Sequence, residues 1–447
     1  METVAQLSGL LRKGKMDAVE LTERTLAAIA ASNDKAIFID HFADRARSEA
    51  KAARKRLKAG KLLSAVDGIP IGWKDLFDIE GRVTTAASVV LKSNPPAQRD
   101  AALVAAGKRA GFVSVGTLNM TEFAYSGIGL NPHYGTPRNP NDLKVHRSPG
   151  GSSSASGVVV AKGLLPVAIG TDTGGSIRIP ASFNGVVGFK ASTGHYPMDG
   201  VFPLSRTFDT LGPLAQTVED CVIVDQALRG LRRTTAKKIA VKGLTFVVPT
   251  NVMFDGIENA VMTNFEAALS RISMAGGKIK CIAFPAFDAI LELIKTRGNI
   301  LGAEALHVHF DRVNGPDAAR MDKRVVGRIK LAEKMTAVDL VEVMLQRRKL
   351  MTQCSDLIGD AIVACPTTPH VAMPIAPLEA DIEEFFRVNV KTLRNTMLGS
   401  FLDWCGLSIP SGTNADGMPT GFLLSAQHGR DADILSTGLA LESLIKG

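Results

Sequence analysis

Long uncharged apolar segments are missing from this sequence, and so is the apolar centre of a secretory signal peptide. No run reaches the roughly 18 residues that cross a bilayer. The first residues, METVAQLSGLLRKGKMDAVE, mix charged and apolar side chains throughout. We therefore expect a cytoplasmic protein that makes no contact with a membrane.

Cysteine is scarce, and zinc, Walker and dinucleotide motifs are absent. The odd number of cysteines and their lack of metal-ligand spacing indicate reduced, mostly buried thiols at Cys221, Cys281, Cys354, Cys365 and Cys405. His307 and His309 have no third ligand nearby, so we interpret them as ordinary helix or interface histidines. The glycine-rich run 170–176 lacks the Gly-Lys-Ser/Thr ending of a phosphate loop. We expect no metal and no cofactor.

Positive charge is in excess, with a net charge of +8, which would permit contact with nucleic acid. The basic residues are spread along predicted helices such as 45–61 and 323–334. Solvated helix faces explain this distribution more simply, so we predict no nucleic-acid partner.

Strand and helix signals alternate along the chain and predict an α/β fold, with a sheet covered by helices on both faces. Residues 66–74 read as the first strand, Asp100 as the cap of a helix that ends at Gly111, and 113–115 as the next strand. Residues 1–60, including 38–57, read as N-terminal helices, with Asp17 as a cap. We predict one domain over 1–447, with a core at 66–225 and the rest of the sheet and its helices in 226–447.

The stretch 148–190 holds two Gly-Gly-Ser turns, which end at Ser152 and Ser176, around the apolar segment 158–169. Glycine lets the backbone bend sharply and leaves N–H groups free to point inward. N–H groups beside a hydroxyl can hold an oxyanion next to a nucleophile. A glycine-rich connection between buried elements is the alternative interpretation of each turn.

A serine nucleophile needs a base, and the usual Gly-x-Ser-x-Gly elbow is absent. Only His146 and His195 lie near the two turns in the sequence. Lys74 follows an otherwise apolar run, and burial could make it neutral enough to accept a proton. A lysine that extends from a strand edge to solvent is the alternative.

These motifs together resemble the amidase signature family. The matching residues are Gly68-Ile69-Pro70 with Lys74-Asp75, Pro149 to Ser154, Gly170 to Arg178, Gly188-Phe189-Lys190 and Asp209 to Pro213. The resemblance is dense over 66–225 and thinner elsewhere. It implies the amidase signature fold, with one large mixed β-sheet between layers of helices.

The resemblance also implies a Ser–Ser–Lys relay. Ser176 would be the nucleophile, and Ser152, entered by a cis peptide bond, would pass its proton to Lys74. The oxyanion would bind to the backbone N–H groups of Thr173, Gly174, Gly175 and Ser176. The loop at 119–140 precedes the first serine turn, and Tyr125 and Ser126 are our candidates there for binding substrate.

We predict hydrolysis of a small carboxamide or urea-like amide through an acyl-enzyme. The alternative is the A subunit of a tRNA-dependent amidotransferase, which releases ammonia from glutamine for its partner subunits. That subunit usually carries Met-Asp-Glu-Phe-Ala-Met-Gly where this chain has residues 120–126, MTEFAYS. A third interpretation, a non-catalytic binding subunit, would require Lys74 to point away from Ser152.

A homodimer is common in the family. Arg347 and Arg348 could reach a substrate carboxylate or lie on a solvated helix face.

Overall fold

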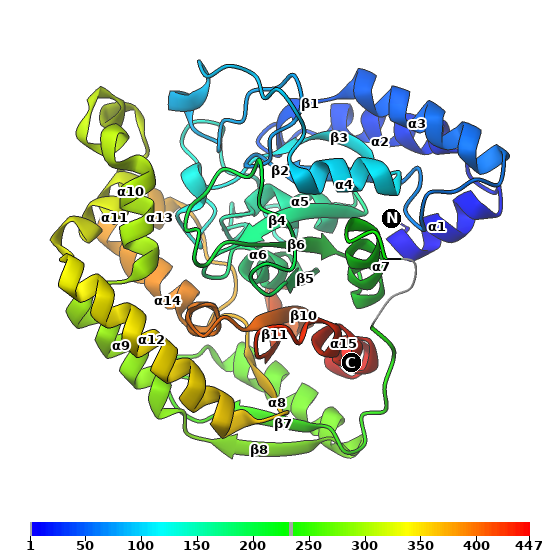
Figure 1. Cartoon of the computed structure of the whole chain (residues 1–447). Helices are drawn as coiled ribbons and strands as arrows, with labels where there is room; N and C mark the ends of the chain where they lie inside the picture. Colours follow the sequence, from blue (N-terminus) through cyan, green and yellow to red (C-terminus); the bar gives the residue numbers. More distant parts are fainter. Residues whose placement is uncertain (1, 232–235) are drawn as a thin grey trace.

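Eleven strands form one mixed sheet in the computed structural model, which describes residues 2–231 and 236–447 (Figure 1). The strand order is β1-β3-β2-β4-β6-β5-β10-β11-β9-β7-β8. The pairs β2–β3, β2–β4, β7–β8 and β7–β9 are parallel, and the remaining pairs are antiparallel. The strands are β1 (Phe38–His41), β2 (Pro70–Lys74), β3 (Val113–Leu118), β4 (Val167–Asp172), β5 (Val187–Lys190), β6 (Thr210–Ala215), β7 (Thr245–Pro249), β8 (Lys278–Ile282), β9 (Ile362–Pro366), β10 (Cys405–Thr413) and β11 (Pro419–Ala426).

Fifteen α-helices surround this sheet within the described residues. They are α1 (Val4–Arg12), α2 (Ala18–Ala31), α3 (Ala43–Lys58), α4 (Ala102–Ala110), α5 (Ser154–Ala161), α6 (Arg178–Asn184), α7 (Val218–Leu228), α8 (Asn259–Met274), α9 (Pro285–Arg297), α10 (Ile300–Asn314), α11 (Lys323–Lys330), α12 (Ala337–Ile358), α13 (Ala376–Ala380), α14 (Ile382–Phe401) and α15 (Asp431–Lys446). Among the helices of 2–231 and 236–447, none has both the length and the apolar character of a membrane span.

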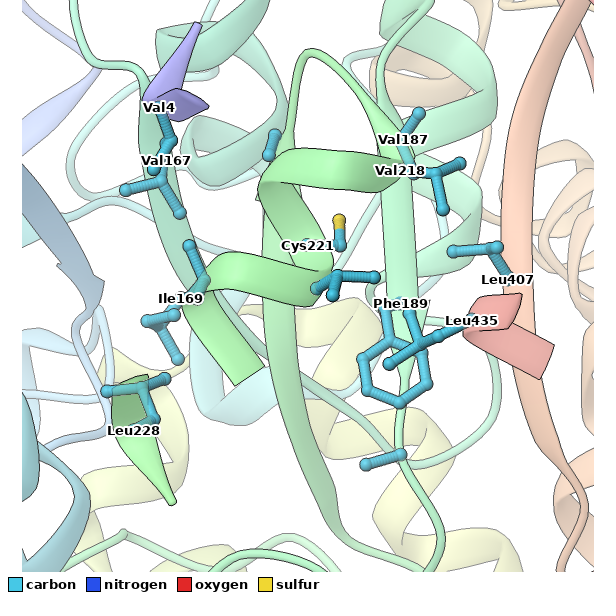
Figure 2. Packing of buried hydrophobic residues seen from close by; sticks show 14 of the residues in the cluster. Val4, Val167, Ile169, Val187, Phe189, Val218, Cys221, Leu228, Leu407 and Leu435 are labelled. Atoms are coloured by element: carbon cyan, nitrogen blue, oxygen red, sulfur yellow. The ribbon is translucent and has the colours of Figure 1, made fainter. Parts of the chain in front are cut away.

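Helices cover both faces of the sheet, as the alternation of side chains along β4 demonstrates. Val167 and Ile169 belong to an apolar cluster that includes Cys221 of α7 (Figure 2). Ala168, which lies between them, belongs to another cluster with Val158 of α5. Successive side chains of a strand point to opposite faces, so α5 and α7 cover opposite sides. The predicted fold, a mixed sheet covered on both faces, is confirmed.

The two central strands β2 and β4 are parallel neighbours, with Gly72 opposite Ala168. Their carboxyl ends therefore meet at one edge of the sheet, and each leads into polar sequence. Lys74 is the last residue of β2, and Asp172 is the last of β4, just before the second glycine-rich turn and α6. The fold thus brings Lys74 and Asp172, about a quarter of the chain apart in sequence, to the same edge of the sheet.

Two boundaries near the N-terminus differ from the sequence prediction. Phe38–His41, predicted as helix, is the edge strand β1 and pairs antiparallel with β3; helix α3 begins only at Ala43. The backbone hydrogen bonds offered by β3 outweigh the helical preference of this short segment. The strand predicted from residue 66 begins at Pro70, because Gly68 has a φ of +90° and turns the chain sharply.

The two predicted helix caps have different outcomes. Asp17 caps α2 as predicted, accepting hydrogen bonds from the backbone N–H groups of Val19 and Glu20. Asp100 does not cap α4, whose N-cap is Ala101. The Asp100 carboxylate instead pairs with Arg45 at 2.8 Å. An ion pair with a helix far away in sequence has replaced the expected local contact.

Candidate active site

Lys74 is completely buried at the end of β2, with its nitrogen between two hydroxyl groups. Lys74 Nζ donates hydrogen bonds to Ser152 Oγ at 2.6 Å and to Thr171 Oγ1 at 2.7 Å. The geometry places Lys74 toward Ser152. A lysine that reaches solvent from a strand edge, the alternative interpretation, is excluded by this burial.

Burial lowers the pKa of Lys74 from 10.5 to about 7, and the negative charges of Asp209 and Asp172 oppose that change only in part. Asp172 forms an ion pair with Arg178 at 2.9 Å. Asp209 accepts a hydrogen bond from Thr173 Oγ1 at 2.6 Å, and burial raises the pKa of this carboxyl to about 6. A lysine with a pKa near 7 is partly neutral at physiological pH, which a general base requires.

Ser152 lies in a tightly packed turn. The peptide bond between Gly151 and Ser152 is cis, as the family resemblance implied. A Cβ atom on Gly151 would lie 2.6 Å from the backbone nitrogen of Gly129, so only glycine fits here. The backbone N–H of Thr121 donates to the Ser152 carbonyl at 3.0 Å, which fixes the orientation of the turn.

Ser176 lies between β4 and α6, and only 4% of its surface is exposed. The N–H of Ser153 donates to the Ser176 carbonyl oxygen at 3.2 Å and so ties the two serine turns together. Within the described chain, no hydrogen bond involves the Ser176 hydroxyl group. A proton bridge between the hydroxyls of Ser152 and Ser176 therefore stays a prediction.

The turn from Thr173 to Ser176 presents free backbone donors. In the part of the chain that the structure describes, none of these four N–H groups donates to a protein acceptor. Thr396 Oγ1 donates to the carbonyl oxygen of Gly174 at 2.6 Å, and Asp172 Oδ2 accepts from the N–H of Ile177 at 3.1 Å. These contacts hold the turn from both sides, which leaves its N–H groups available to an oxyanion.

Ser176 opens into a pocket with a few polar groups in a largely apolar lining, as is usual for small-molecule sites. Its walls are mostly apolar, and helices α9, α10 and α14 contribute six of the lining residues. The lining residues are Ala124, Tyr125, Ser126, Thr173, Gly174, Ser176, Leu204, Phe208, Ile294, Asn299, Leu301, Arg328, Leu393, Met397, Ser400 and Phe401. The pocket thus contains Thr173, Gly174 and Ser176, and both residues that we singled out in the 119–140 loop.

The two loop residues contact the pocket differently. The Tyr125 ring stacks against Arg328, whose guanidinium carbon lies 4.2 Å from the ring centre. Ser126 Oγ donates to Asn389 Oδ1 at 3.1 Å and accepts from the N–H of Ile128 at 3.0 Å. Ser126 is therefore already engaged in holding the loop, whereas Tyr125 lies beside a charged group.

Two residues of the site, Thr171 and Arg328, were not predicted from the sequence. Thr171, which accepts from Lys74, lies within the recognised Gly170 to Arg178 motif, but nothing in the motif separates it from its neighbours. Arg328 belongs to the basic segment 323–334, whose residues we had placed on a solvated helix face. For Arg328 that interpretation is wrong, because it is partly buried and lines the pocket.

Arg347 and Arg348, which we considered as ligands of a substrate carboxylate, do not line the pocket. Arg347 donates from Nε to the Phe401 carbonyl at 2.7 Å and stacks over Phe208 at 4.6 Å, so it supports the wall from behind. Arg348 is exposed. His309 is buried beside Phe123, whereas His307 is exposed, so the two histidines face different directions.

Comparison with known proteins identifies the family. A family model described as Amidase matches residues 20–435. The 2-amino-5-chloromuconic acid deaminase of Comamonas testosteroni is 34% identical over 411 residues, covering 90% of this chain and 87% of that protein. Mandelamide hydrolase of Pseudomonas putida is 31% identical over an alignment of 474 residues, covering 99% and 91%. The A subunit of glutamyl-tRNA(Gln) amidotransferase from Roseiflexus castenholzii is 30% identical over 476 residues, covering 98% and 95%.

Solved structures agree with these relatives. A structure from a vestigial protein complex linked to the evolutionary origins of an s-triazine catabolic enzyme is 28% identical, with a TM-score of 0.88 over 99% of this chain and 98% of that one. A crystal structure of an amidase has the same TM-score of 0.88 at 27% identity, covering 99% and 100%. The chain therefore belongs to the amidase signature family and is a hydrolase that acts on C–N bonds.

Proposed function

We propose that this protein hydrolyses a small carboxamide or urea-like amide through a covalent acyl-enzyme on Ser176. The observation that carries the proposal is the 2.6 Å contact between the buried Lys74 nitrogen and Ser152 Oγ. A buried lysine with a pKa of about 7 can accept a proton near neutral pH. The same contact argues against a non-catalytic binding subunit.

In the proposed first half-reaction, Ser176 Oγ attacks the carbonyl carbon of the amide. Its proton passes to Ser152, whose own proton passes to the neutral Lys74 nitrogen. The C–N bond then breaks as the leaving nitrogen takes a proton back from Lys74 through Ser152. Ammonia or an amine departs, and the acyl group stays on Ser176 as an ester.

In the second half-reaction, water attacks the ester while the same relay accepts its proton. The bond between the acyl carbon and Ser176 Oγ breaks, and the returning proton restores the serine. In both halves the negative oxygen would bind to the free N–H groups of Thr173, Gly174, Gly175 and Ser176. The loss of one such donor typically costs about 3 kcal/mol of barrier.

The relatives support this reaction class and leave a second candidate. Mandelamide hydrolase acts on a small amide, and the A subunit of the tRNA-dependent amidotransferase aligns at 30% identity over 98% of this chain. Such a protein would use the same residues to release ammonia from glutamine. The stand-alone hydrolase is favoured because the chain departs from that subunit's usual Met-Asp-Glu-Phe-Ala-Met-Gly segment at Thr121, Tyr125 and Ser126.

The proposed partners are few. A small amide fills the pocket, the relay needs neither metal nor cofactor, and nucleic acid has no part in the reaction. A homodimer is the assembly that we propose from the family. The cysteines are free and four of the five are buried, which suits a reducing compartment such as the cytoplasm.

Ammonia release from a panel of small amides, ureas and glutamine tests the proposal. We expect turnover of at least one small amide and its loss in Ser176→Ala. Burst kinetics with an activated amide would report the acyl-enzyme. Turnover of glutamine alone would support the amidotransferase role, and turnover that persists in Ser176→Ala would overturn the assigned nucleophile.

A further inference from the structure

Arg328 is the only charged residue among the described residues that line the Ser176 pocket. No carboxylate of residues 2–231 or 236–447 forms an ion pair with it. The lining residues of the pocket within those ranges include no aspartate or glutamate. The pocket therefore carries a positive charge that the described protein does not neutralise.

The guanidinium of Arg328 is held in place from one side. Nη1 donates to the Tyr125 carbonyl at 2.7 Å, and the guanidinium carbon lies 4.2 Å from the centre of the Tyr125 ring. The donors on Nε and Nη2 have no acceptor within the described chain. An immobilised guanidinium with free parallel donors matches the two oxygens of a carboxylate.

Arg324, one helical turn earlier on α11, provides the contrast. Its Nη2 lies 2.7 Å from Asp322 Oδ2, and its Nε also donates to that carboxylate. Arg324 thus has the partner that Arg328 lacks. Both arginines belong to the same short helix, so what distinguishes them is the presence or absence of a carboxylate partner.

The surroundings of Arg328 disfavour an isolated cation. Burial lowers the pKa of the Arg328 guanidinium, although arginine stays charged at physiological pH. Removal of a cation from water is costly unless an anion compensates for it. A bound carboxylate would provide that compensation.

Two further groups of the same pocket favour an anion. Tyr125 Oη makes no hydrogen bond to any described residue, and it lies near the first turn of α10, 3.6 Å from where a Cβ atom on Gly302 would be. Asn299 caps α10 through the N–H of Gly302 and also lines the pocket. The amino end of a helix carries partial positive charge.

We propose that Arg328 and Tyr125 bind a carboxylate on the acyl part of the substrate, so that the preferred substrates are monoamides of short dicarboxylic acids or similar acidic amides. The apolar side chains that line the pocket, such as Leu204 and Phe208, suit the short chain between the two groups. This inference rests on the proposed amide hydrolysis at Ser176 and specifies its substrate class.

A matched pair of substrate series tests the inference. The acidic series consists of the monoamides of malonic, succinic and glutaric acid, and the neutral series of propionamide, butyramide and valeramide, in which a methyl group replaces the carboxylate. We expect the wild-type protein to have a kcat/KM roughly 100-fold higher for one acid than for its neutral counterpart. Arg328→Gln should lower kcat/KM far more for the acidic series than for the neutral series, and so abolish most of that preference.

Arg324→Gln is the control, because it removes a charge from the same helix outside the pocket. We expect it to leave the ratio of acidic to neutral kcat/KM unchanged. Arg328→Lys keeps the positive charge but lacks the two parallel donors of a guanidinium. It should give an intermediate ratio of acidic to neutral kcat/KM. Equal losses on both series in Arg328→Gln, or no wild-type preference for an acid, would overturn the inference while amide hydrolysis stands.

A binding measurement separates this inference from the proposed reaction. Calorimetry with the succinic monoamide and Ser176→Ala should detect binding that disappears in the Ser176→Ala/Arg328→Gln double variant. If no amide is turned over but this binding is present, the proposed hydrolysis fails and the carboxylate site stands. If the double variant binds as well as Ser176→Ala does, the site is excluded. Thermal unfolding of each variant checks that the fold is intact.

Discussion

Arg178 and Asp172 form a buried ion pair through two hydrogen bonds of 2.9 Å, and this pair holds the turn that carries Ser176. Their side chains are 1% and 0% exposed. Arg178 also donates to Ser400 Oγ at 2.8 Å, and Ser400 lines the pocket. The pair therefore connects the end of β4, the start of α6 and the pocket wall on α14.

Asp172→Asn should destabilise the protein strongly, because it leaves the Arg178 cation buried without a counter-charge. We expect the free energy of unfolding to fall by about 3–5 kcal/mol, measured by urea denaturation. The control is Arg54→Met, which breaks the more exposed pair with Asp17 and should cost less than about 1 kcal/mol. Equal effects of the two variants would contradict the structural role of the buried pair.

Gly175→Ala should also destabilise the protein, by about 2 kcal/mol or more. Gly175 has a φ of +144°, and a Cβ atom there would overlap Thr396 Oγ1 and lie 2.6 Å from Ile179 Cδ1. The adjacent Gly174 provides the comparison, since its Cβ would lie 3.8 Å from Leu393 Cδ2, an ordinary contact. Gly174→Ala should therefore unfold at nearly the wild-type urea concentration. A reversed order of the two stabilities would contradict the turn geometry.

The pH dependence of amide hydrolysis should report Lys74. The pKa of Lys74 is about 7, and only the neutral amine accepts a proton, so kcat/KM should fall as the pH decreases through 7. Well below that pKa the fall should approach about tenfold per pH unit. A rate that stays constant between pH 5.5 and 8 would rule out Lys74 as the titrating base.

Thr171→Val should move this acidic limb to lower pH. The Thr171 hydroxyl accepts a hydrogen bond from Lys74 at 2.7 Å and so stabilises the charged form of the lysine. Loss of that bond should lower the pKa of Lys74 further, by roughly one unit. Thr171→Ser retains the hydroxyl and should keep the wild-type profile. An unshifted limb in Thr171→Val would mean that this hydroxyl does not affect the proton affinity of Lys74.

The catalytic candidates were accessible from the sequence because each lies within a short local motif. Beside Ser152 and Ser176, Gly151 and Gly175 occupy positions that only glycine fits, because of the close approach of other backbone atoms at Gly151 and the positive φ of Gly175. Lys74 was recognisable as the charged residue that ends an apolar strand. The alternation of strands and helices sufficed for the fold class.

Apart from Tyr125 and Ser126, the pocket walls were not accessible from the sequence, because they depend on contacts between residues far apart in the chain. Tyr125 and Arg328 are separated by 203 positions, and a basic helix looks the same in sequence whether one arginine faces solvent or a pocket. The edge strand β1 was missed for a similar reason. Its four residues are defined by pairing with β3 rather than by their own pattern.

The division of the pocket along the chain has a consequence for how this protein could acquire new substrates. The proposed chemical groups all lie between residues 74 and 176, whereas most of the apolar wall and Arg328 come from α9 to α14, residues 285–401. Recombination or directed evolution confined to the later segment could therefore exchange one acyl group for another without altering the relay.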